Sequence, residues 1–284
     1  MNRLKNNKLA IVTSGGGMAC SYTSGVLKGL IKKYNLKKPD IVIGSSGSAG
    51  IISYYVAGQY DNMIRGWYEL SSQKRKFVNP LRFWKIMDID YLVDEIIQKK
   101  YPLNVDRIQN SKTKLMISAT DYLKGRVKYF SNFHKYDIYK VIKASKSLPI
   151  AYNRKIKINK DLYCDSPISS SLSENLKKAV ELGAKKIIAI HNTHPVTNII
   201  FYGYKAWLSF QNKNFRNNHP RPLRYLKNVD FKAAVGPKVE IVSLKPELES
   251  SQQFISANRN QIKSTIKAGY QNAVRNKELE KLFS

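Results

Sequence analysis

A short buried strand that runs straight into a turn of small residues constrains the fold of this chain most. Residues 41–50 read Ile-Val-Ile-Gly-Ser-Ser-Gly-Ser-Ala-Gly, and a helical pattern continues to Gly58. An apolar run of this length between helical segments indicates a strand buried on both faces, as in a parallel sheet. A serine on such a strand–turn–helix connection stands at the edge of the sheet on a strained backbone, with a helix N-terminus behind it. The segment therefore predicts an α/β fold that carries a nucleophile elbow.

Two serines compete for the nucleophile position in this turn. Ser46 lies in a G-x-S-x-S form, and Ser48 lies in an S-x-S-x-G form. Neither matches G-x-S-x-G in full. Ser46 directly follows the strand and its first glycine, where a nucleophile is expected, so we favour Ser46 and keep Ser48 as the alternative. A plain phosphate-binding loop is a further interpretation, but the turn lacks the G-x-x-x-x-G-K-[ST] signature.

A second glycine segment stands between an earlier strand and helix. Gly15, Gly16 and Gly17 follow the strand-like residues 9–13 and precede a helical pattern over residues 21–34. Consecutive glycines let backbone N–H groups converge on an anion, as an oxyanion hole requires. Dinucleotide sites also place glycines here, but the G-x-G-x-x-G fingerprint is not completed.

The rest of the chain extends the same alternation. Further strands are predicted at residues 114–119, 126–130 and 185–190, and a helix over 174–182 ends at Gly183. We expect one domain over residues 1–284, of α/β class, as a three-layer sandwich with a mainly parallel central sheet. From about residue 250 the chain is expected to be mainly helical, with one or two polar amphipathic helices over 253–284.

The residues alone leave two kinds of partner for the serine, a histidine or a carboxylate. The histidines are His134, His191, His194 and His219, and none has a context that recommends it as a base. His191 and His194 follow a strand end and stay open as bases of a catalytic triad. Asp165 follows a short strand and precedes a small-residue turn, so a carboxylate acting directly on the serine is the other option.

Taken together, these segments resemble the patatin-like phospholipases. The resemblance rests on ordered blocks at Gly15–Leu27, Gly44–Ser48, Ala144–Pro149 and Tyr163–Pro167, and it covers roughly residues 8–192. They are similar to the family's glycine-rich oxyanion loop with its G-V-L helix, its elbow, its A-S-x-x-x-P segment and the D-G-[GA] that holds the catalytic aspartate. The fold that the resemblance implies is patatin-like.

The resemblance implies acyl transfer by a Ser–Asp dyad. Asp165 would take the proton of Ser46, whose oxygen attacks an ester carbonyl of a lipid, and water would then release the fatty acid. Gly15, Gly16 and Gly17, together with Gly47, would form the oxyanion hole. This chemistry needs no cofactor or metal, and the sequence has no metal-ligand spacing.

The chain also departs from the family pattern. Ala19 and Cys20 stand where the loop usually has a basic residue and a glycine, and Lys28 or Lys32 is expected to compensate for the lost cation. Ser48 replaces the last glycine of the elbow, as in cytosolic phospholipases that share the fold. Asp165-Ser166-Pro167 replaces D-G-G. A catalytically inactive fold that binds anionic lipid or nucleic acid is therefore the alternative function.

Charge and composition point to an anionic partner. The chain has 49 basic and 20 acidic residues, a net charge of +29. Basic and aromatic residues mix at 74–85 and 199–210, a combination found at membrane interfaces and in single-strand binding. Given the lipid chemistry, we expect an anionic phospholipid surface and consider nucleic acid unlikely as a partner, although an AT-rich genome also produces such charge.

The remaining features concern location and the cysteines. The sequence shows no signal peptide and no apolar run long enough to span a membrane, so a cytoplasmic protein, peripheral at a membrane, is expected. Cys20 and Cys164 are too few for a disulfide framework and are expected to be small buried fillers.

Overall fold

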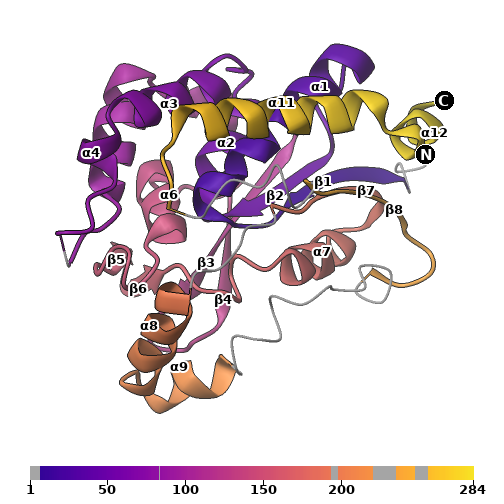
Figure 1. The fold of residues 1–284 in the computed structure, drawn as a ribbon. Coiled ribbons are helices and arrows are strands. Elements are labelled where there is room, and N and C mark those ends of the chain that lie inside the picture. The colour runs from indigo at the N-terminus through magenta and orange to yellow at the C-terminus, as the bar shows by residue number, and fades with distance from the viewer. Residues whose placement is uncertain (1–6, 83, 193–197, 220–234, 247–254) are drawn as a thin grey trace.

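The computed structural model describes residues 7–82, 84–192, 198–219, 235–246 and 255–284 (Figure 1). Its centre is an eight-stranded sheet in the order β5-β6-β3-β2-β1-β7-β8, and β4 pairs with β3. The strands are β1 (Lys8–Thr13), β2 (Ile41–Ser45), β3 (Lys114–Asp121), β4 (Val127–Ser131), β5 (Ile156–Ile158), β6 (Asp161–Cys164), β7 (Ala184–Ile190) and β8 (Glu240–Leu244).

The sheet is parallel at its centre. β3, β2, β1, β7 and β8 pair in parallel, whereas β4 and β6 run antiparallel to β3, and β5 runs antiparallel to β6. Val12 is in register with Ile43 on one side and with Ala189 on the other, so β1, β2 and β7 end at the same edge. The predicted α/β class with a mainly parallel sheet is confirmed.

Helices cover both faces of this sheet, as Figure 1 shows. Alternate strand residues point to opposite faces. Ile11 and Val42 belong to the larger apolar core, while Val12 and Ile43 belong to a second core beneath α7. The helices are the 3₁₀ turn η1 (Gly17–Cys20), α1 (Ser21–Tyr34), α2 (Gly47–Val56), α3 (Asn62–Ser72), α4 (Lys74–Phe77), the π-helix η2 (Tyr91–Lys100), α5 (Val105–Gln109), α6 (Ile138–Lys146), α7 (Leu172–Glu181), α8 (Asn198–Ser209), α9 (Lys213–Asn218), α11 (Arg259–Arg275) and α12 (Lys277–Phe283).

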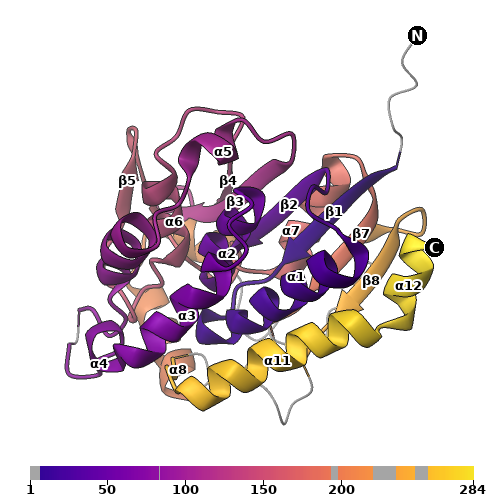
Figure 2. The same ribbon diagram turned by 90° about the horizontal axis from the view of Figure 1, so that it is seen from above.

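The long helix α11 lies along α1 on the larger core (Figure 2). Glycines let the two backbones touch. A Cβ atom on Gly25 would lie 2.0 Å from the carbonyl oxygen of Ile266, and one on Gly269 would lie 2.3 Å from that of Tyr22. Both α11 and α12 fall within the segment expected to be helical. No helix in the described ranges has the length and apolar character needed to cross a bilayer.

Candidate active site

Ser46 stands on a strained backbone between β2 and α2. Its φ of 51° and ψ of −124° lie in a region that residues with a side chain rarely adopt. Such a conformation costs about 1–3 kcal/mol and persists only where the surroundings enforce it. The strand brings Ser46 to the carboxyl edge of the sheet, and α2 presents its N-terminus directly behind the side chain.

The glycine loop between β1 and η1 lies against this elbow. Gly16 has a φ of 150° and Gly17 a φ of 55°, so both adopt backbone conformations that favour glycine. A Cβ atom on Gly15 would lie 2.9 Å from the Cβ of Ser46. A Cβ atom on Gly47 would lie 2.3 Å from the carbonyl oxygen of Gly17. The loop and the elbow therefore approach each other only because these positions have no side chain.

The N–H groups of the predicted oxyanion hole differ in their bonding. The N–H of Gly15 donates to the carbonyl oxygen of Ser170 at 2.8 Å, so it is already engaged. Among the residues that the structure describes, no backbone acceptor takes the N–H of Gly16, Gly17 or Gly47. Gly17 and Gly47 also line the same pocket as Ser46. These three amides are the candidate donors to a developing anion.

Asp165 follows β6 and lies next to the serine. The Ser46 hydroxyl lies beside its carboxylate and favours the charged form, and the N–H of Ser166 donates a hydrogen bond to the carboxylate at 2.8 Å. The Asp165 side chain is only 1% exposed. Burial raises its pKa to about 7, against the opposing effect of these contacts and of the Lys146 charge. A carboxyl group with this pKa can accept a proton near neutral pH, unlike an ordinary aspartate.

The histidines have other surroundings. His191 follows β7, and its backbone N–H donates to the carbonyl oxygen of Leu244 at 2.8 Å. Burial lowers the pKa of its side chain. His219 stacks on Phe215, and burial lowers its pKa to about 4. His194 lies outside the described residues. Among the residues that the structure describes, the carboxylate of Asp165 lies beside the Ser46 hydroxyl.

Ser48, the alternative nucleophile, is hydrogen-bonded inside the protein. Its hydroxyl donates to the carbonyl oxygen of Ser14 at 2.8 Å and accepts from the side-chain amide of Asn192 at 3.2 Å. Asn192 also donates to the carbonyl oxygen of Ser14 at 2.9 Å, so it joins the glycine loop to the elbow. Sequence reasoning missed Asn192; its position two residues after the end of β7 is the signal that would have found it.

The departures from the family pattern are accommodated locally. Cys20 lies against Gly47, and burial raises the pKa of its thiol to about 12, so the thiol is neutral. Ser166 has no positive φ, and its hydroxyl lies 2.7 Å from that of Thr120. A glycine is therefore not needed after Asp165 in this backbone. Both cysteines are buried and unpaired, as expected.

Three consecutive residues at the C-terminus of α6 hold both halves of the site. Ser145 Oγ accepts the N–H of Ser46 at 2.8 Å, and Lys146 Nζ donates to the carbonyl oxygen of Ser46 at 2.8 Å. The carbonyl oxygen of Ser147 accepts the N–H of Asp165 at 3.0 Å. None of these residues was singled out from the sequence, although they belong to the A-S-x-x-x-P segment.

Ser46 opens onto a narrow apolar pocket of about 70 Å³. Helices on the larger core supply most of its wall, with Ile51, Met63, Trp67, Leu70, Ile96 and Ile97. Lys146 is the cation that lines this pocket within the described part of the chain. Lys28 and Lys32, expected to compensate for the missing loop cation, are exposed and line a separate cavity with Lys37 and Arg65.

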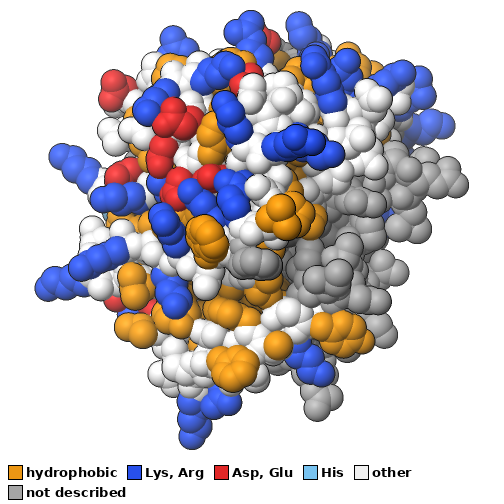
Figure 3. Space-filling model, turned by 60° about the vertical axis from the view of Figure 1, so that its left-hand side comes forward, with side chains coloured by type: hydrophobic (Ala, Val, Ile, Leu, Met, Phe, Trp, Pro, Cys, Tyr) orange, Lys and Arg blue, Asp and Glu red, His pale blue; other side chains and the backbone are white. Residues whose placement is uncertain are grey.

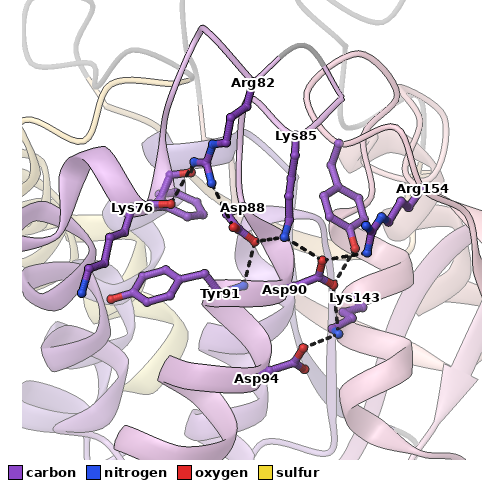
Figure 4. A network of polar contacts seen from close by, with 11 residues as sticks. Lys76, Arg82, Lys85, Asp88, Asp90, Tyr91, Asp94, Lys143 and Arg154 are labelled. Carbon is purple, nitrogen blue, oxygen red and sulfur yellow. Dashed lines mark hydrogen bonds and ion pairs between the residues drawn. The ribbon is translucent and has the colours of Figure 1, made fainter.

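A segment after α4 forms another side of the pocket. Phe77, the last residue of α4, and Met87 and Ile89 from the segment beyond it line the pocket. Figure 4 shows how ion pairs anchor the segment: Lys85 bridges Asp88 at 2.8 Å and Asp90 at 3.0 Å. Further pairs join Arg82 to Asp88, and Asp90 to Lys143 and Arg154. Burial would raise the pKa of Asp90, but hydrogen bonds from Tyr152, Lys85 and Lys143 outweigh it and lower that pKa to about 2.

Known proteins resemble this chain in family pattern and in fold. The model of the patatin-like phospholipase family matches residues 11–173, which is more than half of the chain. Among solved structures, the fold is similar to that of VipD from Legionella pneumophila, with a TM-score of 0.50 and 11% sequence identity. The match covers 97% of this chain and 67% of the other. No sequence matched in the comparison with curated proteins.

Proposed function

This chain belongs to the patatin-like phospholipase family, and on that premise we propose that it is a serine acyl hydrolase that cleaves fatty acyl esters of membrane lipids. The observation that carries the proposal is the placement of the Ser46 hydroxyl beside the buried carboxylate of Asp165, where Ser46 lines an apolar pocket. A nucleophile needs a base within hydrogen-bond reach, and a lipid needs an apolar place for its chain.

Asp165 is the proposed general base and Ser46 the nucleophile. Asp165 takes the hydroxyl proton while Ser46 Oγ bonds to the ester carbonyl carbon. The tetrahedral intermediate collapses as the C–O bond to the alcohol breaks, and the proton passes from Asp165 to that alcohol. Water, deprotonated by the same carboxylate, then splits the acyl-enzyme and releases the fatty acid.

The oxyanion of each intermediate is proposed to accept hydrogen bonds from Gly16, Gly17 and Gly47. Their N–H groups lie on the loop and at the N-terminus of α2, whose dipole also favours negative charge. One preorganised donor of this kind contributes about 3–4 kcal/mol to transition-state stabilisation. Gly15 supports the hole by close packing against Ser46 rather than by donating.

The pocket and surface support a lipid as substrate. A narrow apolar pocket suits an unbranched acyl chain. Leu81 and Trp84, in the segment that borders the pocket, are 79% and 59% exposed and follow the basic residues of α4. Figure 3 shows hydrophobic side chains gathered in the lower half of one face, with Lys and Arg side chains around them. Apolar anchors beside cations suit a surface of anionic phospholipid.

The test is fatty-acid release from phospholipid vesicles, together with labelling by a fluorophosphonate. Wild type is expected to release fatty acid and to be labelled at Ser46. Ser46→Ala is expected to lose both, and Asp165→Asn to lose at least about 100-fold in rate, as expected for removal of a general base. Ser48→Ala is expected to be labelled still, because its hydroxyl is bonded to Ser14.

Two controls separate chemistry from surface binding. Release is expected to rise with the anionic lipid content of the vesicle and to fall with salt, whereas hydrolysis of a soluble short-chain ester is expected to ignore both. A wild type that is neither labelled nor active on any lipid would refute the hydrolase proposal. Labelling of Ser48 in the Ser46→Ala variant would move the nucleophile to Ser48.

A further inference from the structure

A buried lysine lies beside the elbow without a carboxylate partner. Lys146 is 8% exposed, and its ammonium donates to the carbonyl oxygens of Ser46 at 2.8 Å and Gly47 at 3.0 Å. No ion pair of Lys146 occurs within the ranges that the structure describes. Lysines are almost never this buried unless paired, because desolvating the charge is costly. A lysine retained at such a cost calls for a role at the site.

Lys146 is not placed to act as the base. Its nitrogen donates to carbonyl oxygens, which cannot give it a proton, and the carboxylate of Asp165 is the group beside the Ser46 hydroxyl. Its position at the last turn of α6 suits a cation, because the helix dipole is negative there. The contacts therefore assign Lys146 to the backbone of the elbow rather than to the serine oxygen.

The carbonyl oxygen that Lys146 holds belongs to the same peptide group as a candidate oxyanion donor. The carbonyl of Ser46 and the N–H of Gly47 are two ends of one planar unit and point in opposite directions. Fixing the oxygen of that unit fixes the direction of its hydrogen. A cation on the oxygen also polarises the peptide and makes its N–H a stronger donor.

Ser145 completes the hold on the strained residue. Its hydroxyl oxygen accepts the N–H of Ser46, so both peptide groups that flank Ser46 are fixed by neighbouring residues of α6. Without such restraint a φ of 51° at a non-glycine residue would relax. Relaxation would rotate the Ser46–Gly47 peptide and turn its N–H away from the position of the oxyanion.

We propose that Lys146 is a positioning residue, whose ammonium holds the Ser46 carbonyl oxygen and thereby aims the Gly47 N–H into the oxyanion hole. Lys146 thus supplies a cation from α6, whereas the glycine loop of this chain has Ala19 in place of the usual basic residue. This inference rests on the proposed function for its catalytic consequence, while the restraint of the elbow itself does not depend on activity.

The charge of Lys146 depends on the pH and on a few neighbouring groups. Asp165 after β6 and Cys20 on η1 face it, and Lys143 one turn earlier on α6 is paired with Asp90 and Asp94. Burial lowers the pKa of Lys146 to about 8, although Cys20 and Asp165 oppose this. The ammonium is thus present at neutral pH and is lost as the pH rises through about 8.

The test compares Lys146→Met and Lys146→Gln with Lys140→Met, an exposed lysine on the same helix. The rate of fluorophosphonate labelling is measured, in which Ser46 Oγ bonds to phosphorus, fluoride leaves and the phosphoryl oxygen occupies the oxyanion hole. Lys146→Met is expected to react about 10- to 100-fold more slowly, as for a misaligned catalytic group, and Lys140→Met as fast as wild type. Lys146→Gln keeps an N–H donor and is expected to fall between them.

Two further readouts separate positioning from a purely structural role. With a soluble ester, kcat is expected to fall in Lys146→Met with little change in KM. The decline of wild-type kcat above pH 8 is expected to vanish in that variant. Equal labelling rates, or an unchanged alkaline decline, would overturn the proposal even for a fully active wild type.

If wild type is not labelled, the hydrolase proposal is refuted but the proposal for Lys146 is not. Amide hydrogen exchange of residues 44–50 then tests whether Lys146 restrains the elbow. Exchange over these residues is expected to be at least tenfold faster in Lys146→Met than in Lys140→Met. Equal exchange in the two variants would mean that Lys146 does not restrain the elbow. Lys146→Gln serves for the same comparison if the Met variant fails to fold.

Discussion

The backbone N–H of Asp165 donates a 3.0 Å hydrogen bond to the carbonyl oxygen of Ser147, one residue beyond the lysine that holds the Ser46 carbonyl. The proposed base and the proposed nucleophile are therefore fixed against the same end of α6. This shared support keeps the buried carboxylate in hydrogen-bond reach of the serine.

The buried carboxylate should control the acid side of the pH profile. Since burial raises the pKa of Asp165 to about 7, the base is protonated and inactive below that pH. We expect kcat/KM for a soluble ester to rise about tenfold per pH unit below pH 7 and to level off there. An acid limb centred near pH 4 would show that Asp165 titrates as an ordinary aspartate and would contradict this expectation.

The same pKa has a consequence for stability. The folded-state pKa of Asp165 lies above its ordinary value of 3.8, so folding favours the protonated form, and the cost of ionising the carboxyl group grows between about pH 4 and pH 7. We expect Asp165→Asn to raise the free energy of unfolding at pH 8 by about 1–4 kcal/mol, since a tenfold change in proton affinity corresponds to about 1.4 kcal/mol. Urea denaturation at pH 8 and pH 4.5 measures it. Asp161→Asn, at the start of the preceding strand β6 and half exposed, is the control and should change little.

Gly47 should not tolerate even one methyl group. The Cβ of Gly47→Ala would lie 2.3 Å from the carbonyl oxygen of Gly17 and 2.6 Å from Cys20 Sγ. We expect the glycine loop to be displaced, with labelling of Ser46 lost and stability reduced by about 1–3 kcal/mol through overpacking. Gly66→Ala, with nothing within 4 Å of its added Cβ, is the stability control. Wild-type labelling of Gly47→Ala would disprove the close approach.

Gly66 offers a way to shorten the pocket. It lines the apolar pocket on α3, and a Cβ there meets no atom within 4 Å. We expect Gly66→Leu to reduce kcat/KM for long-chain esters at least about tenfold while short-chain esters are hydrolysed nearly as before, because pocket shape discriminates by acyl length. A series of p-nitrophenyl esters measures this. Arg65→Ala, an exposed neighbour, is the control, and equal loss across the series would place the acyl chain elsewhere.

The ion pairs of Asp90 should stabilise the segment that borders the pocket. Its pKa is lowered to about 2, so its contribution is present above about pH 4 and is lost as the pH falls through 2. We expect Asp90→Ala to cost about 1–3 kcal/mol at pH 7, because its pairs with Lys85 and Lys143 are only partly exposed. Asp137→Ala, which removes an exposed pair with Lys140, should cost less than about 1 kcal/mol. Thermal unfolding of both variants checks the difference.

The structural features that are best predicted are those that depend on residues adjacent in the sequence. The strand before Ser46, the glycine turn and helix α1 over residues 21–34 form where local periodicity and turn residues indicate. β8 was not predicted, because its residues Glu240 and Ser243 interrupt a short run at the edge of the sheet. Lys146 was missed for a different reason. Its role depends on where α6 packs against α2, which no local pattern reveals.

Local sequence patterns also do not reveal which hydrogen bonds a single group makes or how its pKa is shifted. Three consecutive glycines suggest three equivalent donors, yet the N–H of Gly15 is used by Ser170, a residue far along the chain. Likewise the sequence places Asp165 after a strand, but its raised pKa depends on tertiary burial. The identity of the candidate nucleophile and base is thus readable from motifs, whereas their electrostatics are not.

The backbone contact between α1 and α11 bears on how the molecule is made. Lys33 on α1 bonds to the carbonyl oxygen of Val274 on α11, 241 positions later in the chain. At about 5–20 residues per second, α1 leaves the ribosome on the order of ten to fifty seconds before this partner has been synthesised. Contacts across so long a stretch also form slowly. Nascent chains therefore carry the glycine loop and α1 for some time without the helix that packs along α1, and the fold is complete only after α11 has been synthesised.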